Sequence, residues 1–528
     1  MSRGVSLSRT LAKHELLIVA GIATVWCALT SWARPLLLPD EGRYVGVAWE
    51  MMASGDWLTP TLSGLPYFHK PPLFYWISAA TMSVLGTGEF AARMPSLVGA
   101  LMALIATYYF VRRRFDAPTA RLSLLILGTM PLFFGGAQYA NLDMLVAGCI
   151  TVTICFAAQA VKLHDENEPA RNALVAAYAS AALGVLAKGL IGVVLPGMVI
   201  VLWLALTRRP KALLKLISLP GLLIFALIAA PWFIAMQIKF PEFFDYFFLE
   251  QHFRRFTQSG FNNVHPFWFY PVALSAASLP WCLWLVPSLR RGFLRQLFND
   301  ERLLLLWVWL FAVVIFFSLP SSKLLGYVLP ATPPLAILIA AAIQKRRAQG
   351  AAPESLFRAT TLAATTICVA VIIAVSSMPL KSVKPLALNI KADMQAYDRV
   401  FLVEEAFFDV ALYAALKSPP SVVEHWRDPK IPLEDTWLKE LLDASRFTSS
   451  TRSKVLVHTE NLRDEICAIK RSWVVTPREL EARIAWLADF KTLATTQRDA
   501  LRLIDTSDPT ISAALRCPQM PSTDSTKK

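Results

Sequence analysis

Two pairs of ionisable residues follow the first apolar run of the chain and stand about thirty residues apart. Asp40 and Glu41 lie in LPDEGRY, and His69 and Lys70 lie in YFHKPPL. A carboxylate in a partly dry site can take a proton from an acceptor or orient it during group transfer. A lysine ammonium is a compact point charge suited to a phosphate. These residue types therefore predict group transfer from a phosphate-bearing donor. The alternative is that the charges only mark where the chain leaves a membrane.

Further ionisable residues recur at the ends of later apolar runs. They come from YANLDML, LAKGLIG, EQHFRRF and SSKLLGYVLP, and they are Asp143, Lys188, Glu250, His252, Arg254, Arg255, Lys323 and Tyr327. Each one alone could simply be a charged or polar residue at the point where a span leaves the membrane. Together they predict one outer-face site of carboxylates, imidazoles and cations, which suits an anionic lipid-linked substrate.

A metal site needs separate consideration. His69 and His252 are candidate ligands of a divalent metal, Zn²⁺ or Mg²⁺, with Glu250 as a third donor. The chain lacks the close spacing of an HExxH or CxxC motif around these residues. A hydrogen-bonding role is therefore favoured for both histidines, and no cofactor is predicted to be required.

Composition places these residues in a membrane protein. The chain has 528 residues, 55% of them hydrophobic, and a mean hydropathy of +0.46. Eleven apolar runs between residues 15 and 378 are near the length that crosses a bilayer as a helix. Residues 1–378 hold 30 Lys and Arg against 17 Asp and Glu, which is +13 of the total charge of +14. Since this excess lies in short loops between spans, nucleic acid is not predicted as a partner.

The basic loops predict the orientation. We place the clusters at 112–114, 208–215, 290–295 and 345–347 in the cytoplasm, so the N-terminus is inside and the C-terminus is outside. The apolar segment 71–88 would invert every later loop if it crossed, so we expect a helix at the outer interface. The segment headed by Asp40 has apolar residues at helical spacing and predicts a second interfacial helix.

The composition changes after residue 378. Short β-rich runs at 399–403 and 454–459 alternate with helical patterns such as 478–490. We therefore predict three parts: a membrane domain (1–378), a small periplasmic α/β domain (379–519) and a disordered tail (520–528). Cys467 and Cys517 are candidates for a disulfide in that domain, although their spacing alone does not decide whether they pair.

The ordered motifs resemble the aminoarabinose transferase-like membrane glycosyltransferases of the C-type fold, which are related to protein O-mannosyltransferases. The likeness covers residues 35 to about 343 and rests on LPDEGRY, YFHKPPL, AARMPS, YANLDML, LAKGLIGVVLPG, EQHFRRF, HPFWFY and FSLPSSKLLGYVLP in this order. It implies a polytopic α-helical membrane protein in the bacterial inner membrane. Such enzymes take a sugar from a polyprenyl-phosphate donor at the periplasmic face and transfer it with inversion to an envelope acceptor, lipid A or another glycolipid.

The resemblance also implies roles for particular residues. The family's essential acidic residue falls on Asp40, beside Glu41, and its second functional aspartate falls on Asp143. The expected donor-phosphate contacts are Lys70 and Tyr327, with Lys323, Arg254 and Arg255 as helpers. The pattern departs at His69, where the lipid A-modifying enzymes carry a metal-binding Glu opposite the histidine that matches His252. The C-terminal part also departs, so the acceptor is not carried over.

Two other functions fit part of the pattern. A protein O-glycosyltransferase would use the same donor class. A polyprenyl-lipid transporter or flippase would place ionisable residues near the bilayer midplane and contain internal repeats. The sequence has no evident repeat, and its charges gather at one face, which favours the transferase. An inactive lipid-binding scaffold is disfavoured because both aspartates and Lys70 are present.

Overall fold

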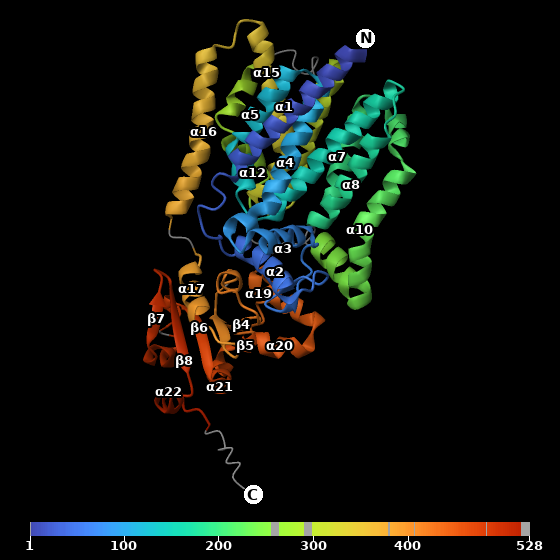
Figure 1. The fold of residues 1–528 in the computed structure, drawn as a ribbon. Coiled ribbons are helices and arrows are strands. Elements are labelled where there is room, and N and C mark those ends of the chain that lie inside the picture. Colours follow the sequence, from blue (N-terminus) through green and yellow to red (C-terminus); the bar gives the residue numbers. More distant parts are fainter. Residues whose placement is uncertain are drawn as a thin grey trace. The chain divides into compact units, whose positions relative to one another are not determined.

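The computed structural model describes residues 2–254, 263–289, 298–378, 381–405, 407–481 and 483–518 and divides into two compact units (Figure 1). Unit 1 comprises residues 1–34 and 68–378, and unit 2 comprises residues 35–67 and 379–528. The segment 35–67 thus groups with the C-terminal part, whereas the sequence pattern placed it in the membrane domain. The predicted tail, 520–528, lies outside the described residues.

Unit 1 is built from helices. In chain order they are α1 (Ser2–Ala28), α3 (Leu73–Leu85), α4 (Glu89–Arg114), α5 (Ala117–Gly128), α6 (Pro131–Ala137), α7 (Leu142–Asp165), α8 (Arg171–Lys188), α9 (Ile191–Leu206), η1 (Pro210–Leu216), α10 (Leu219–Lys239), η2 (Asp245–Arg254), α12 (Phe269–Ala277), η3 (Trp281–Leu289), α14 (Glu301–Ser318), η4 (Leu325–Ala331), α15 (Thr332–Ala348) and α16 (Glu354–Ser377). Polar caps fix several of their starts. Asp116 accepts a hydrogen bond from the Thr119 amide at α5, and Asp300 accepts one from the Arg302 amide at α14.

Many of these helices are apolar enough for a membrane. Among the described residues, six helices have the length and composition of a span, and eight segments qualify if each of two sharply bent helix pairs counts once. The predicted polytopic α-helical membrane architecture is therefore confirmed. The segment predicted as an outer helix rather than a span, 71–88, contains the short helix α3, which has 13 residues.

Small residues bring the central helices of unit 1 close together, and α4, α7 and α8 lie side by side in Figure 1. A Cβ on Gly148 of α7 would overlap the Gly99 backbone of α4, and a Cβ on Gly192 of α9 would overlap the Gly184 backbone of α8. Such contacts allow backbones to approach where a larger residue would separate them. A Cβ on Gly184 would also lie 3.3 Å from the Cβ of Cys149 in α7, so the start of α7, the end of α8 and the start of α9 are held together.

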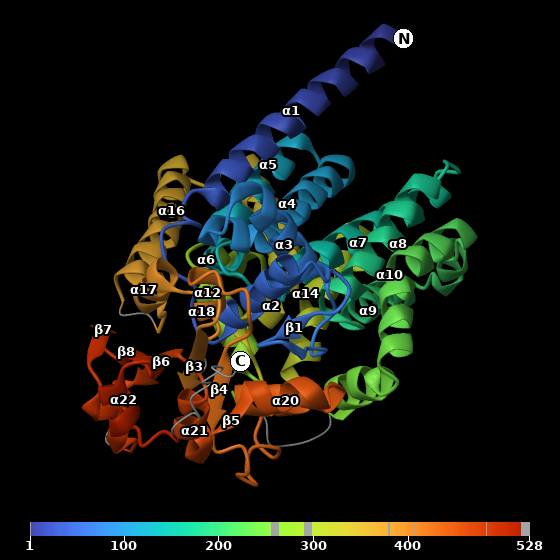
Figure 2. The ribbon, with the colours of Figure 1, turned by 60° about the horizontal axis from the view of Figure 1, so that its bottom comes forward.

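Unit 2 contains a mixed sheet. Its elements are α2 (Asp40–Ser54), β1 (Thr61–Leu62), β2 (Leu65–Pro66), α17 (Lys384–Asp393), β3 (Arg399–Val403), α18 (Val410–Tyr413), β4 (Ser421–Glu424), α19 (Trp437–Ala444), η5 (Ser445–Phe447), α20 (Ser449–Val455), β5 (Leu456–His458), η6 (Thr459–Asn461), α21 (Leu462–Cys467), β6 (Arg471–Pro477), η7 (Arg478–Leu480), η8 (Ala485–Asp489), β7 (Thr492–Thr495), β8 (Asp499–Asp505) and α22 (Pro509–Ala514). Six strands lie in the order β5-β4-β3-β6-β8-β7, which Figure 2 shows as one row. The first four are parallel, while β8 pairs antiparallel with β6 and β7.

The two strands predicted in this part of the chain are confirmed, whereas the predicted helix over 478–490 is not. The run predicted at 399–403 is β3, and that at 454–459 contains β5. The helical pattern predicted over 478–490 is wrong in kind, because this stretch forms the short 3-10 helices η7 and η8. Where the chain leaves β6, the Arg478 amide donates to the Arg498 carbonyl, and the amides of Glu481 and Leu487 donate to carbonyls three residues earlier, as in 3-10 helices.

A disulfide closes the end of unit 2. Cys467 at the end of α21 is bonded to Cys517, with 5.3 Å between the two Cα atoms. Both cysteines pack against the core beneath the sheet, which includes Phe401, Val474 and Ile504. The pairing that the sequence left open is thus present in the structure.

Helix α2 belongs to the core of unit 2. Val45, Val47 and Ala48 are fully buried, and the indole of Trp49 donates a 3.0 Å hydrogen bond to the Leu416 carbonyl. Helix α2 packs against α18. The predicted helix is therefore present, but its apolar side is covered by protein and does not face lipid as the interfacial prediction required.

Candidate functional site

A cavity of about 430 Å³ lies in unit 1 where several helices begin or end. Its walls come from the starts of α7 and α9, the ends of α8 and α14, and η4. The polar lining residues are Lys70, Asp143, Lys188, Gln251, Ser322 and Tyr327, and the apolar ones include Val146, Ile150, Ile191, Val194, Phe316 and Phe317. The cavity thus combines cations with mainly apolar walls.

The start of α7 carries the carboxylate of this cavity. Asn141 caps the helix, since its side-chain oxygen accepts a 3.0 Å hydrogen bond from the Asp143 amide. Ser96 of α4 holds the preceding loop by donating to the carbonyls of Tyr139 (2.6 Å) and Asn141 (3.2 Å). Asp143 is therefore fixed in the first turn of α7, where the helix dipole favours a negative charge.

Lys188 is the direct partner of this carboxylate. It is the last residue of α8, and its Nζ forms an ion pair with Asp143 Oδ1. The same ammonium lies 4.3 Å from the centroid of the Tyr327 ring, a distance typical of a cation–π contact. Gly189 has a φ of 90° and ends the helix immediately afterwards. One ammonium thus contacts both an anion and an aromatic face at the cavity wall.

Gly326 leaves room for the Asp143 carboxylate. A Cβ at position 326 would meet the side chain of Asp143 at its Cβ (3.1 Å), at its Cγ (2.9 Å) and most closely at Oδ2. Since these atoms belong to three successive positions of one short side chain, no small rotation relieves all the contacts. The absence of a side chain at 326 is therefore required for the observed Asp143–Lys188 pair.

The predicted phosphate contacts have different environments. Lys70 and Tyr327 line the cavity together with Asp143. Lys323 does not line it. The ammonium of Lys323 donates to the carbonyl oxygens of Pro320, His265 (2.8 Å) and Ser321 (3.4 Å), so it ties two loops together. Lys323 is 3% exposed and its donors are occupied, which gives it a structural role in this conformation.

The predicted acidic pair lies in unit 2, at the start of α2. Asp40 Oδ1 accepts a 2.6 Å charge-assisted hydrogen bond from Arg43, and its side chain is 33% exposed. Glu41 is fully buried, and its Oε2 accepts a 2.8 Å hydrogen bond from the Leu37 amide. Asp40 therefore keeps an accessible carboxylate, whereas that of Glu41 is engaged in holding the entry to the helix.

The candidate metal ligands do not form a ligand set in the described part of the chain. His69 is buried, with its ring 5.7 Å from that of Tyr246. The side chains of His252 and Arg254, and the whole of Arg255, lie outside the described residues. No group of three His, Cys, Asp or Glu side chains converges to hold a metal among the residues described. The described side chains thus supply no set of ligands for the candidate metal.

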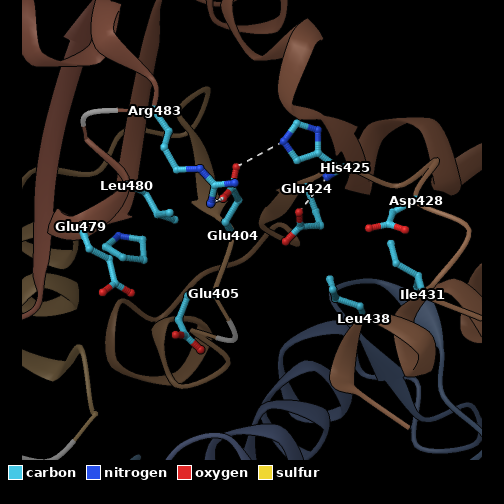
Figure 3. A pocket seen from close by; sticks show the side chains of 11 residues that line it. Glu404, Glu405, Glu424, His425, Asp428, Ile431, Leu438, Glu479, Leu480 and Arg483 are labelled. Carbon is cyan, nitrogen blue, oxygen red and sulfur yellow. Dashed lines mark hydrogen bonds and ion pairs between the residues drawn. The ribbon is translucent and has the colours of Figure 1, made fainter. Parts of the chain in front are cut away.

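A second cavity, of about 340 Å³, lies in unit 2 at the carboxyl edge of β3, β4 and β6 (Figure 3). Glu404, Glu405 and Glu424 line it, with His425 and Arg483. Glu404 is 3.5 Å from the guanidinium of Arg483 and 3.8 Å from His425 Nε2. This excess of carboxylates would repel a phosphate. The cavity in unit 1 is therefore the candidate donor site.

The sequence assigns no specific role to some of these residues. Lys188 was noted between two apolar runs, where an ionisable residue is a signal of function, but only the structure pairs it with Asp143. Gln251 and Ser322 gave no signal, since single neutral polar residues are common at membrane ends. The role of Gly326 depends on a contact between distant parts of the chain, α7 and η4.

Comparisons with known proteins agree with the motifs. The family model that matches is dolichyl-phosphate-mannose-protein mannosyltransferase, over residues 69–234. The chain is similar to the undecaprenyl phosphate-alpha-4-amino-4-deoxy-L-arabinose arabinosyl transferases of Erwinia tasmaniensis (34% identity, covering 58% of this chain and 55% of the relative) and Aeromonas salmonicida (35%, 58% and 56%). The match spans little more than half the length of these curated relatives. The resemblance inferred from the motifs is thereby confirmed.

Solved structures share the fold over a longer stretch. The crystal structure of ArnT from Cupriavidus metallidurans bound to undecaprenyl phosphate matches with a TM-score of 0.75 at 23% identity, covering 96% of this chain and 100% of that one. The archaeal oligosaccharyltransferase AglB from Archaeoglobus fulgidus matches with a TM-score of 0.51 at 15% identity, covering 90% of this chain and 71% of that one. The C-type fold expected from the motifs is therefore confirmed.

Proposed function

We propose that this chain is a membrane glycosyltransferase that moves a sugar from a polyprenyl-phosphate donor to an envelope acceptor, lipid A or another glycolipid. The observation that carries this proposal is the cavity in unit 1. Its cations suit a phosphate, and its apolar walls suit the first isoprene units of a lipid chain. The named activity of the similar arabinosyl transferases supports the same donor class.

The chemistry needs a stabilised leaving group. The bond between the anomeric carbon and the phosphate oxygen breaks, the acceptor oxygen bonds to that carbon from the opposite side, and polyprenyl phosphate leaves. We assign Lys70, Lys188 and the Tyr327 hydroxyl to the developing phosphate charge. Asp143 holds Lys188 in place through their ion pair. Arg254 and Arg255 stay proposed helpers, and Lys323 supports the loops.

Asp40 is assigned to the acceptor. For a hydroxyl acceptor, its carboxylate takes the proton; for a phosphate acceptor, which is already ionised, it orients the attacking group. Its exposed fraction of 33% fits a carboxylate that meets a substrate. Glu41 supports the start of the helix on which Asp40 lies. No step is routed through a metal.

The membrane topology is part of the proposal. We infer eleven spans, with the N-terminus in the cytoplasm and unit 2 in the periplasm. Helices α9 and α15 begin next to the cavity and end near Arg208–Arg209 and Lys345–Arg347, as expected if the cavity opens on the outer side. The Cys467–Cys517 disulfide fits an oxidising compartment. Labelling of single introduced cysteines from either side of the membrane tests this orientation.

Mass spectrometry of envelope lipids tests the function. Lipid A and other glycolipids from a deletion strain are compared with those from the same strain complemented with wild type, Lys70→Ala or Asp40→Asn. We expect one glycoform to vanish in the deletion and to return only with wild type. If no lipid changes while the protein is made, lipid glycosylation is refuted, and protein acceptors are then examined in the same strains.

A further inference from the structure

The carboxylate of Asp40 is one end of a chain of contacts within unit 2. Arg43 donates to Asp40 Oδ1 through Nη2 and to Glu440 Oε1 through Nη1, both at 2.6 Å. Glu440 lies about four hundred residues further along the chain, in α19. One guanidinium therefore bridges Asp40, which is proposed to serve the acceptor, and a carboxylate of the C-terminal part.

Glu440 is itself held in place. Its second oxygen, Oε2, accepts a 2.8 Å hydrogen bond from the Tyr67 hydroxyl. The helix that carries it is capped by Thr436, and its neighbour Leu441 is fully buried in the unit. The Glu440 side chain is 10% exposed, so its geometry is set by protein contacts.

The charge balance explains why such a bridge matters. The Arg43 side chain is only 12% exposed. Burial alone lowers the pKa of Arg43, but the attraction of Glu440 and other nearby groups outweighs it, and the pKa lies well above its usual value. The guanidinium is thus permanently charged and shared between two carboxylates. Without Glu440 its whole charge would act on Asp40, which would become a weaker base and lose its fixed orientation.

We propose that Glu440 is a positioning residue for Asp40 and acts through Arg43. Glu440 accepts a hydrogen bond from Nη1 of Arg43, while Nη2 donates to Asp40 Oδ1. The Asp40 carboxylate therefore keeps one orientation and enough basicity to serve the acceptor. This inference rests on the proposed role of Asp40. The charged and titratable groups that face Arg43 include Asp40 and Tyr44 on α2, Glu440 on α19 and Tyr67 after β2. Asp409, before α18, lies against Gly42 of α2.

The test compares Glu440→Gln with a matched control on the same helix. Glutamine keeps the size of the side chain and an oxygen for the Tyr67 hydroxyl, but removes the charge from Arg43. The control is Asp443→Asn, since Asp443 is more buried than Glu440 and has cationic partners of its own, Arg446 at 2.8 Å and Lys439 at 3.3 Å. A general loss of fold would affect both variants alike.

Two readouts separate positioning from folding. The first is the rate at which carbodiimide modifies Asp40 in the purified protein as pH varies, followed by peptide mass spectrometry, because only the protonated carboxyl reacts. For Glu440→Gln we expect the pH at which the modification rate of Asp40 is half its maximum to fall by roughly half to one pH unit. This readout needs no knowledge of the sugar.

The second readout is formation of the glycoform found by lipid mass spectrometry, measured in membranes at varied pH and donor concentration. For Glu440→Gln we expect kcat to fall roughly tenfold at unchanged donor KM, since the change affects the acceptor side only. Glu440→Asp should recover part of the loss. An unchanged midpoint in Glu440→Gln, or an equal shift in Asp443→Asn, overturns the inference. A fully active Asp40→Asn variant would instead refute the role proposed for Asp40.

Discussion

The contact between Gly326 and Asp143 allows a sharp test of the proposed donor site. In Gly326→Ala, the new methyl carbon would lie 2.9 Å from Asp143 Cγ and 3.1 Å from its Cβ, while ordinary contacts begin at 3.4 Å. The Asp143 side chain must therefore move by about half an ångström or more, and it cannot do so without straining its ion pair with Lys188. The smallest possible substitution thus disturbs the pair while removing no polar group.

The expected effect follows from this displacement. A shift of one ångström in a catalytic arrangement can lower a rate by about 100-fold, so half that shift predicts a loss of roughly tenfold, or about 1.4 kcal/mol. Overpacking is expected to reduce the stability of unit 1 by ~1–3 kcal/mol. The Lys188 ammonium would leave its position over Tyr327, and phosphate binding should weaken by a similar factor.

The assay is the binding of undecaprenyl phosphate to the purified protein, with glycoform formation in membranes measured in parallel. The matched control is Gly197→Ala in α9, where an added Cβ meets nothing within 4 Å. We expect Kd to rise roughly tenfold for Gly326→Ala and to stay unchanged for the control. Wild-type affinity and wild-type rate in a folded Gly326→Ala protein would refute the assignment of the Asp143–Lys188 pair to the phosphate site.

Three further outcomes are expected. Lys188→Ala should lower sugar transfer by at least tenfold, more than Lys188→Arg, because removal of the cation also leaves Asp143 buried without its partner; glycoform mass spectrometry measures both. Replacing Cys467 by Ser should destabilise unit 2 by about 2–4 kcal/mol, seen as a lower midpoint in thermal unfolding of the purified protein. Burial raises the pKa of Asp409 from 3.8 to about 7, although Ser382 donates a hydrogen bond to it. Between these values the folded state binds a proton that the unfolded chain does not, so stability falls as pH rises through this window, by roughly 1.4 kcal/mol per unit. Asp409→Asn should flatten that fall, and an equally steep fall in the variant would contradict this cause.

The membrane part of the fold was predictable because its signals are local. Apolar runs of the length of a bilayer, bounded by basic loops, identify helices without knowledge of their neighbours. The same reasoning brought Lys70, Asp143 and Tyr327 to one end of the helices, and all three line the cavity.

Contacts between distant segments were not predictable. Lys323 has the residue type and motif of a phosphate ligand, but its ammonium donates to two carbonyls of its own loop and to the His265 carbonyl, 58 residues away. Helix α2 has the pattern of an interfacial helix, yet its apolar side packs on α18, which follows it by more than 350 residues. A periodic pattern shows that a face is covered but does not identify what covers it.

The grouping of residues 35–67 with the C-terminal part has a practical consequence for protein engineering. The chain passes from one unit to the other three times, after Arg34, after Tyr67 and after Met378. A truncation at residue 378 would therefore strip α2 of its core partners and expose Val45 and Val47. For the same reason, a chimaera that replaces only the C-terminal 150 residues would pair the α2 of this chain with the α18 and α19 of another protein. Any transplant of this discontinuous domain must carry both of its sequence segments together.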